Sequence, residues 1–119
     1  MPLAPSGGRF ADRENRQATY RSIGKTMDII GSRSAVLIVG EAYNGTTRFN
    51  DFAHRTGLAV TVVAGRLRDL TLHGLLEKQL YRDLGQRSRY EYVLTAKGVG
   101  LATTILKLAQ WADKYLQEN

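Results

Sequence analysis

The stretch "VTVVAGRLRDLTLHGLLEKQLYRDLGQRSRYEYVLT", residues 60–95, contains the change of hydrophobic period that decides the fold. In its first half Val63, Leu67 and Leu70 recur at helical spacing, and Gly74 follows where a helix can end. In its second half apolar and polar residues alternate on both sides of a cationic segment. The sequence therefore predicts a helix at about 59–73, then two short strands joined by a basic turn at about 82–89.

A shorter helix is expected immediately before this one. The text "TTRFNDFAHRTG", residues 46–57, begins with threonines suited to a helix N-cap and ends in Gly57. Two short helices joined by a glycine-containing turn and followed by a hairpin have the order of a helix-turn-helix with a wing.

The segments toward the N-terminus are less regular. Residues 1–8 hold both prolines and two glycines, which is typical of a mobile tail, and residues 9–20 are compatible with a short helix. "SIGKTMDIIGS", residues 22–32, has helical spacing and ends at Gly31. "RSAVLIVGEAYNG", residues 33–45, is a continuous apolar run whose period fits a buried strand or a buried helix.

After the hairpin, residues 96–117 are expected to form one long helix capped by Thr95. Its apolar residues make a stripe too broad for a single small domain to cover, which indicates a partner subunit. The stripe comprises Leu101, Ile105, Leu108, Ala112 and Tyr115.

Composition excludes several classes of protein. The 119 residues suit one domain, and 17 Lys and Arg against 11 Asp and Glu give a net charge of +6, which favours polyanionic partners. There is no cysteine, and His54 and His73 lack a metal-binding spacing, so we expect no metal site, no cofactor and no enzyme. Without a secretion signal or an apolar run long enough to span a membrane, we expect a cytoplasmic protein with no membrane partner.

Six short motifs together point to a known family. From about Ser22 to its end the chain resembles the HxlR family of bacterial winged-helix transcriptional regulators, relatives of the MarR type. The matching text, in the family's order and spacing, is "MDIIGSR" (27–33), "LIVGE" (37–41), "RFNDF" (48–52), "RLRDLTLHGLLEK" (66–78), "YEYVLTAKG" (90–98) and "LAQWADKYL" (108–116).

The resemblance implies a mainly α fold with a small β-hairpin wing, a winged helix-turn-helix with a long C-terminal dimerisation helix. It also places the apolar run at residues 33–45 in a buried helix rather than a strand. Residues 1–20 would be a flexible N-terminal arm with a short helix, and residues 21–119 the DNA-binding domain. The resemblance further implies a homodimer, and the expected interface adds the N-terminal segment and a tryptophan to the stripe: Tyr20, Leu101, Ile105, Leu108, Trp111, Ala112 and Tyr115.

The helix at about 59–73 would enter the DNA major groove. With Val63, Leu67 and Leu70 in the core, the small and polar residues point outward, where they can meet base edges. Arginines at the preceding helix start and in the wing suit phosphates or the minor groove. The expected DNA contacts are Thr47, Arg48, Val60, Thr61, Ala64, Gly65, Arg66, Arg68, Arg87 and Arg89.

Three departures from the family concern its sensing function. Arg21 stands where family members usually carry a cysteine, so thiol sensing is not expected, while Ser34 and Gly40 replace a Trp and an Arg. The missing bulk suggests a pocket for a small apolar effector, or a gap that neighbours such as Tyr43 fill. The pocket would be lined by Tyr20, Met27, Ser34, Leu37 and Trp111.

The sequence thus predicts a homodimeric, sequence-specific DNA-binding transcriptional regulator, a repressor that recognises an inverted repeat in double-stranded DNA. The alternative is a dimeric winged-helix protein-interaction module that has lost sequence-specific DNA binding and uses its basic surface for an acidic protein. RNA binding is a more distant alternative, because stacking aromatic residues are missing from the faces expected to be exposed.

Overall fold

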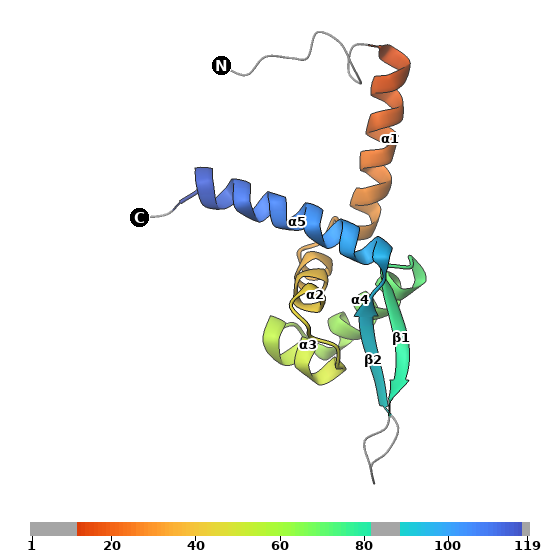
Figure 1. The fold of residues 1–119 in the computed structure, drawn as a ribbon, viewed down its shortest axis with the longest axis vertical. Coiled ribbons are helices and arrows are strands. Elements are labelled where there is room, and N and C mark those ends of the chain that lie inside the picture. Colours follow the sequence, from red (N-terminus) through yellow and green to blue (C-terminus); the bar gives the residue numbers. More distant parts are fainter. Residues whose placement is uncertain (1–11, 82–88, 118–119) are drawn as a thin grey trace. The chain divides into compact units, whose positions relative to one another are not determined.

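Five helices and one hairpin make up the described part of the chain, as Figure 1 shows. The computed structural model describes residues 12–81 and 89–117. The elements are α1 (Arg13–Ile30), α2 (Arg33–Tyr43), α3 (Phe49–Thr56), α4 (Val60–Leu72), β1 (Leu76–Tyr81), β2 (Arg89–Leu94) and α5 (Ala96–Tyr115). This order confirms the mainly α winged helix-turn-helix fold. The chain divides into two compact units, residues 1–31 and residues 32–119.

In the first unit, the described residues form one helix, α1. Asp12 caps it by accepting a hydrogen bond from the backbone N–H of Glu14 at 2.8 Å, and Gly31 forms the C-cap as predicted. The sequence suggested a short helix before residue 20 and another after it, but the structure has one continuous helix. Only Gly24 interrupts the run of helix-compatible residues, at a cost of about 1 kcal/mol relative to alanine. The expected domain boundary between residues 20 and 21 falls inside this helix and stays a prediction.

Helix α2 is the central element of the second unit. The ambiguous apolar run is a helix, as the family resemblance predicted, and Ser32 caps it by accepting the N–H of Ala35 at 3.2 Å. Helices α3, α4 and α5 and strand β2 all contact α2. Because it is covered on several sides, Ile38 and Val39 are completely buried.

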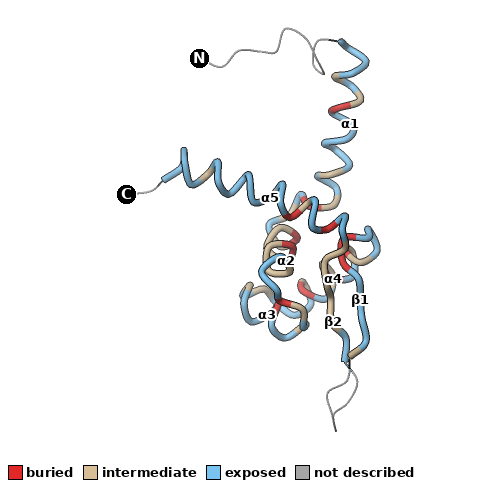
Figure 2. The backbone as a smooth tube through the Cα atoms, in the orientation of Figure 1, coloured by how far each residue is buried: buried red, intermediate tan, exposed pale blue. Residues whose placement is uncertain are grey.

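The core of the second unit lies where α2, α3, α4 and the start of the hairpin meet. Figure 2 shows the buried positions gathered at the inner sides of these elements. The largest fully buried side chains are Phe52, Ile38, Leu67, Leu70, Leu75, Leu76, Val39 and Val63. The three core positions predicted for α4 are therefore confirmed.

Two glycines end the helices of the helix-turn-helix in a left-handed conformation. Gly57 closes α3 with φ of 72°, and Gly74 follows α4 with φ of 77°. The N–H of Gly74 donates to the carbonyl of Thr71, and the N–H of Leu75 to that of Leu70, the pattern of a Schellman motif. The chain can therefore turn from α4 directly into β1.

The hairpin pairs β1 with β2 in antiparallel register from Leu76 opposite Leu94 to Tyr81 opposite Arg89. Residues 47 and 48 lie along the free edge of β2, where the N–H of Tyr92 donates to the carbonyl of Thr47 at 2.8 Å. The hairpin therefore lies beside the start of α3.

Helix α5 begins against the turn between α4 and β1. The Thr95 side chain accepts the N–H of Gly98 at 3.1 Å, and the Thr95 N–H donates to the Leu75 carbonyl at 3.0 Å. Gly98 is buried, and a Cβ there would overlap the Leu75 carbonyl oxygen and lie 2.8 Å from a methyl carbon of Leu94. This close approach fixes the direction in which α5 leaves the hairpin.

Candidate nucleic-acid interface

The outward face of α4 carries small and polar residues. Val60, Thr61, Ala64 and Arg68 are exposed and Gly65 is half-buried, which confirms the orientation predicted from the helical period. Val60 leaves 59% of its surface accessible although it is apolar. A helix face with little bulk allows its backbone to approach another surface closely.

The start of α4 presents unsatisfied backbone donors. Its N-cap is Ala59, and within the described residues no side chain caps it. The first N–H groups of a helix have no intrahelical acceptor, and they give this end a partial positive charge. The helix end nearest the exposed Val60 and Thr61 is therefore suited to an anionic or hydrogen-bonding partner.

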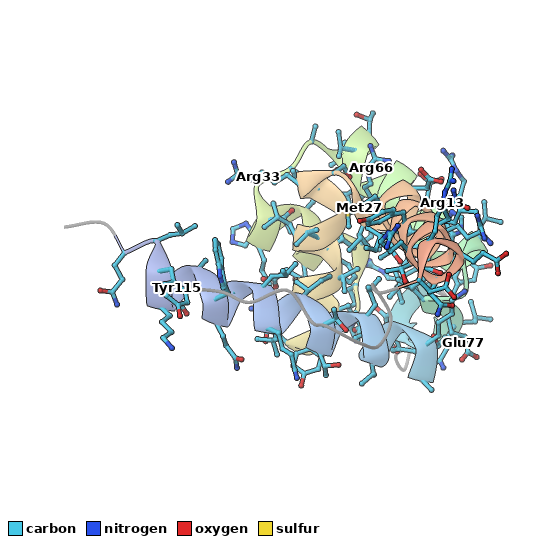
Figure 3. All side chains as sticks on the ribbon, turned by 90° about the horizontal axis from the view of Figure 1, so that it is seen from above. Arg13, Met27, Arg33, Arg66, Glu77 and Tyr115 are labelled. Atoms are coloured by element: carbon cyan, nitrogen blue, oxygen red, sulfur yellow. The ribbon has the colours of Figure 1, made fainter. Side chains whose placement is uncertain are left out.

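Arg66 is held within the protein. Its Nε donates to the Ser34 hydroxyl of α2 at 2.8 Å, and its Nη1 lies 3.2 Å from the Asp69 carboxylate one turn further along α4. Figure 3 labels this arginine among the side chains. Arg66 therefore has a structural role, because it joins α4 to the beginning of α2, and its predicted DNA contact would come in addition to that role.

The threonines before α3 do not cap it, which corrects the expectation from the sequence. The Thr46 hydroxyl donates to the Glu41 carboxylate at 2.9 Å, and the Thr47 hydroxyl donates to Glu91 at 2.8 Å. The N-cap is Arg48, which makes no side-chain capping bond. Thr47 and Arg48 extend beside β2, where the Glu91 carboxylate reaches Thr47, while Thr46 turns back to Glu41 near the end of α2, five residues earlier.

Arg48 and Arg89 border one open hollow between the start of α3 and the hairpin. The Arg48 guanidinium carbon lies 4.3 Å from the centre of the Tyr81 ring, and Arg89 is exposed at the first position of β2. The hollow has a volume of about 440 Å³ and is lined by Arg48, Phe49, Asn50, Asp51, Tyr81, Arg89, Tyr90 and Tyr92. Arg87, the other predicted wing contact, lies outside the described residues.

A second groove contains a cation that the sequence did not single out. It has a volume of about 280 Å³ and is lined by Ala64, Arg68, Thr71, Leu72, Lys78 and Tyr92. Lys78 comes from β1, and its ammonium lies 4.1 Å from the centre of the Tyr90 ring. The signal that could have found it is the alternation along the strand, which places Lys78 on one sheet face with Leu76 and Leu80.

Comparison with known proteins identifies the family. The family model described as HxlR-like helix-turn-helix matches residues 29–119. The chain belongs to the HxlR-like helix-turn-helix family.

Relatives and a solved structure agree with this assignment. The chain is 36% identical over 95 residues to the uncharacterized HTH-type transcriptional regulator Rv3095 of Mycobacterium tuberculosis, a match that covers 80% of this chain and 59% of that protein. It is 32% identical to the uncharacterized HTH-type transcriptional regulator YvaP of Bacillus subtilis, over 80% of this chain and 87% of YvaP. The structure of PA1607 superposes with a TM-score of 0.72 at 34% identity, over 81% of this chain and 66% of PA1607. The chain thus spans about three fifths of the length of the mycobacterial relative.

The C-terminal half of α5 in this HxlR-like chain exposes several large apolar side chains to solvent. Leu108, Trp111 and Tyr115 are exposed by 60%, 55% and 62%, while Leu101, Ile105 and Ala112 are half-buried. The Trp111 and Tyr115 rings lie with their centres 5.9 Å apart. Tyr20, the remaining residue of the expected dimer interface, is exposed on α1.

The residues of the expected effector pocket are divided between the two units. Tyr20 and Met27 belong to α1, while Ser34, Leu37 and Trp111 belong to the second unit. The Ser34 hydroxyl already accepts the hydrogen bond from Arg66 and lies 3.3 Å from the Ser32 hydroxyl. The polar atom that replaces the family's tryptophan is therefore satisfied within the protein, and the effector pocket stays a prediction.

The described residues contain neither a metal-binding cluster nor a helix that could span a membrane. Within residues 12–81 and 89–117, no group of three or more His, Cys, Asp or Glu is placed to hold a metal ion. Over the same ranges, no helix combines the length and apolarity needed to cross a membrane.

Proposed function

We propose that this chain is a homodimeric, sequence-specific DNA-binding transcriptional regulator that acts as a repressor. The observation that carries the proposal is the outward face of α4, which is exposed, poor in bulk and uncapped at its N-terminus. An apolar residue such as Val60, 59% exposed, stabilises nothing in solution but can pack on a thymine methyl group. The names of the relatives as HTH-type transcriptional regulators support the proposal.

Recognition and affinity are assigned to different residues. Val60, Thr61, Ala64 and Gly65 read base edges in the major groove, because they form the small and polar face of α4. Arginines bind phosphates or the minor groove and give affinity with little sequence preference. This second group comprises Arg48, Arg68 and Arg89, together with Arg87, and Thr47 and Arg66 are secondary candidates whose side chains also bind within the protein.

We place the interface of the homodimer on the exposed apolar face of α5. In a two-fold symmetric dimer the two α4 helices read half-sites about one helical turn apart, roughly 34–36 Å, so the operator is an inverted repeat. Since the 119 residues contain no cysteine, regulation through this chain is independent of thiols. We propose a small apolar molecule as the effector; the alternative is that neighbouring side chains fill the gap and no effector binds there.

The rival function is a protein-interaction module that keeps the fold and the dimer. The observation in its favour is exposed apolar surface near basic groups, which together suit an acidic protein. Leu72, 78% accessible, lines a groove with Arg68 and Lys78, and Leu80, 63% accessible, lies on the same strand as Lys78. Binding to duplex DNA separates the two functions.

The test is a titration of the full chain with a fluorescent duplex that carries the DNA flanking its own gene, over a range of salt concentrations. The logarithm of the association constant should fall steeply and linearly with the logarithm of salt concentration, by roughly 0.9 for each phosphate contacted. A flat response, or equal affinity for every duplex at physiological salt, contradicts the proposal.

A further inference from the structure

We propose that Lys78, together with Arg68, binds the backbone of the DNA strand that passes between α4 and the hairpin. The inference rests on the proposed function and adds a phosphate site on β1 to it. The site is the α4–hairpin groove, defined by its lining residues Ala64, Arg68, Thr71, Leu72, Lys78 and Tyr92.

The strand register places Lys78 on the side of the hairpin that faces this groove. Lys78 lies opposite Tyr92, and Leu76 lies opposite Leu94, two positions away on the same sheet face. Leu76 is buried at 2% exposure, and strand β1 contacts α4. Because side chains at alternate positions share a face, Lys78 projects from the same face as the core residue but beyond the core.

The charge of Lys78 is held by aromatic rings, and no carboxylate of the described residues forms an ion pair with it. Its ammonium lies 4.1 Å from the Tyr90 ring centre and 6.0 Å from that of Tyr92. Aromatic faces attract a cation but carry no net charge, so the positive charge of Lys78 is not neutralised. Arg66 differs in this respect, because its guanidinium forms an ion pair with Asp69.

The two walls of the groove present charge of one sign only. Arg68 stands on the α4 wall and Lys78 on the hairpin wall, and none of the six lining residues is acidic. The Arg68 guanidinium lies beside Gly65, with Nη2 4.0 Å from where a Cβ of that glycine would be. Two cations on opposite walls repel each other weakly until an anion lies between them.

The remaining lining suits a nucleotide backbone better than a free anion. Leu72 is 78% exposed and Tyr92 forms part of the opposite wall, so both give apolar surface for the deoxyribose. The Thr71 hydroxyl, by contrast, donates to the Leu67 carbonyl at 2.7 Å and is occupied within the helix. The groove thus offers charge for phosphate and apolar contact for sugar, on the same side as the exposed face of α4.

The decisive test compares Lys78→Met with Lys107→Met in the full chain. Both substitutions remove one exposed lysine and so change the net charge equally, but Lys107 lies on α5 and lines neither this groove nor the hollow beside Arg48. The probe is a mixed-sequence 30-base-pair duplex titrated at several potassium chloride concentrations. We expect Lys78→Met to make the salt slope shallower by about 0.9 for each Lys78 that contacts a phosphate, and Lys78→Arg to restore it.

The outcomes separate this inference from the proposed function. If the unmodified chain binds neither this duplex nor the duplex from the DNA flanking its own gene, the proposed function itself fails. If it binds and Lys78→Met has the slope of Lys107→Met, the groove does not hold DNA and the inference is overturned. A parallel titration with polyglutamate, a mimic of an acidic protein, tests the rival function. If Lys78→Met loses polyglutamate binding while its duplex binding is unchanged, the inference is overturned and the groove belongs to an acidic protein.

The absence of cysteine from the sequence allows an independent measurement. Lys78→Cys and Lys107→Cys each give a chain with one thiol, which can carry a short photocrosslinker. The probe at position 78 should crosslink to the duplex at least tenfold more than the probe at position 107. Equal crosslinking from the two positions contradicts the inference.

Discussion

Two glycines of the second unit, Gly98 and Gly65, have opposite consequences for stability. A Cβ at Gly98 would overlap the Leu75 carbonyl, whereas a Cβ at Gly65 would meet only the end of Arg68 at 4.0 Å. The first glycine is required by the packing of α5 on the α4–β1 turn. The second is not required by the fold, which is consistent with a role at the surface.

Gly98→Ala should destabilise the protein by about 1–3 kcal/mol, because the added methyl group overpacks a buried site whose neighbour is backbone. The matched control is Gly100→Ala in the same helix, where no atom lies within 4 Å of the new Cβ. This control should be neutral or stabilising by up to about 1 kcal/mol. Urea denaturation followed by circular dichroism measures both, and equal stabilities of the two variants would refute the packing account.

Gly65→Ala should separate stability from DNA binding. The substitution removes a helix-interior glycine with ordinary backbone geometry, so the free energy of unfolding should rise by about 1 kcal/mol. The same methyl group stands on the face proposed to approach the bases, so affinity for the operator should fall roughly tenfold. Unfolding and anisotropy titrations measure the two effects, and unchanged affinity would place Gly65 outside the DNA contact.

The Arg66–Ser34 hydrogen bond of 2.8 Å links α4 to the beginning of α2, in addition to the core packing between the two helices. In a double-mutant cycle of unfolding free energies, Ser34→Ala and Arg66→Met should couple by about 0.5–1.5 kcal/mol. Arg68→Met is the matched control, since Arg68 lies on the exposed face of the same helix. Additive effects of Ser34→Ala and Arg66→Met would show that this hydrogen bond does not stabilise the fold.

Arg66 is also a predicted DNA contact, and the salt slope of binding tests that second role. If Arg66 binds a phosphate, Arg66→Met makes the slope shallower by about 0.9 for each phosphate that the side chain no longer neutralises. If its role is only to hold α4, affinity falls without a change of slope.

The elements were largely predictable from the sequence because their signals are local. The period of Val63, Leu67 and Leu70 fixed α4, and Gly57 and Gly74 marked the helix ends. The run at residues 33–45 was not predictable from its period, because α2 is covered on several sides and lacks a polar face.

The errors at the site arose from side-chain contacts that the helix-capping pattern does not include, one of them between residues far apart in the sequence. The hydroxyls of Thr46 and Thr47 bind Glu41 and Glu91 instead of capping α3, and the pairing with Glu91 spans 44 residues. Lys78 was missed because its place beside Tyr90 depends on the strand register. The alternation along β1 indicates which sheet face Lys78 is on, but it does not indicate which residue of β2 lies opposite.

For the complete assembly, the uncovered face of α5 predicts a dimer in solution. Leu108→Lys places a charge in the centre of this face and should weaken association by about 2 kcal/mol or more. Gln110→Lys adds the same charge to an exposed position on another side of α5. Sedimentation at micromolar concentration should find Leu108→Lys monomeric and Gln110→Lys dimeric, and dimers of both would contradict the assigned interface.

The proposed regulator reads DNA sequence with the outward face of α4, and selection of duplexes from a random library by the full chain is the sharpest test of this role. We predict that the selected duplexes share an inverted repeat with half-sites about one helical turn apart. We also predict that Thr61→Val changes the selected bases, while Arg89→Ala weakens binding and leaves them unchanged. A library that shows no enriched sequence after selection by the dimer would contradict sequence recognition by α4.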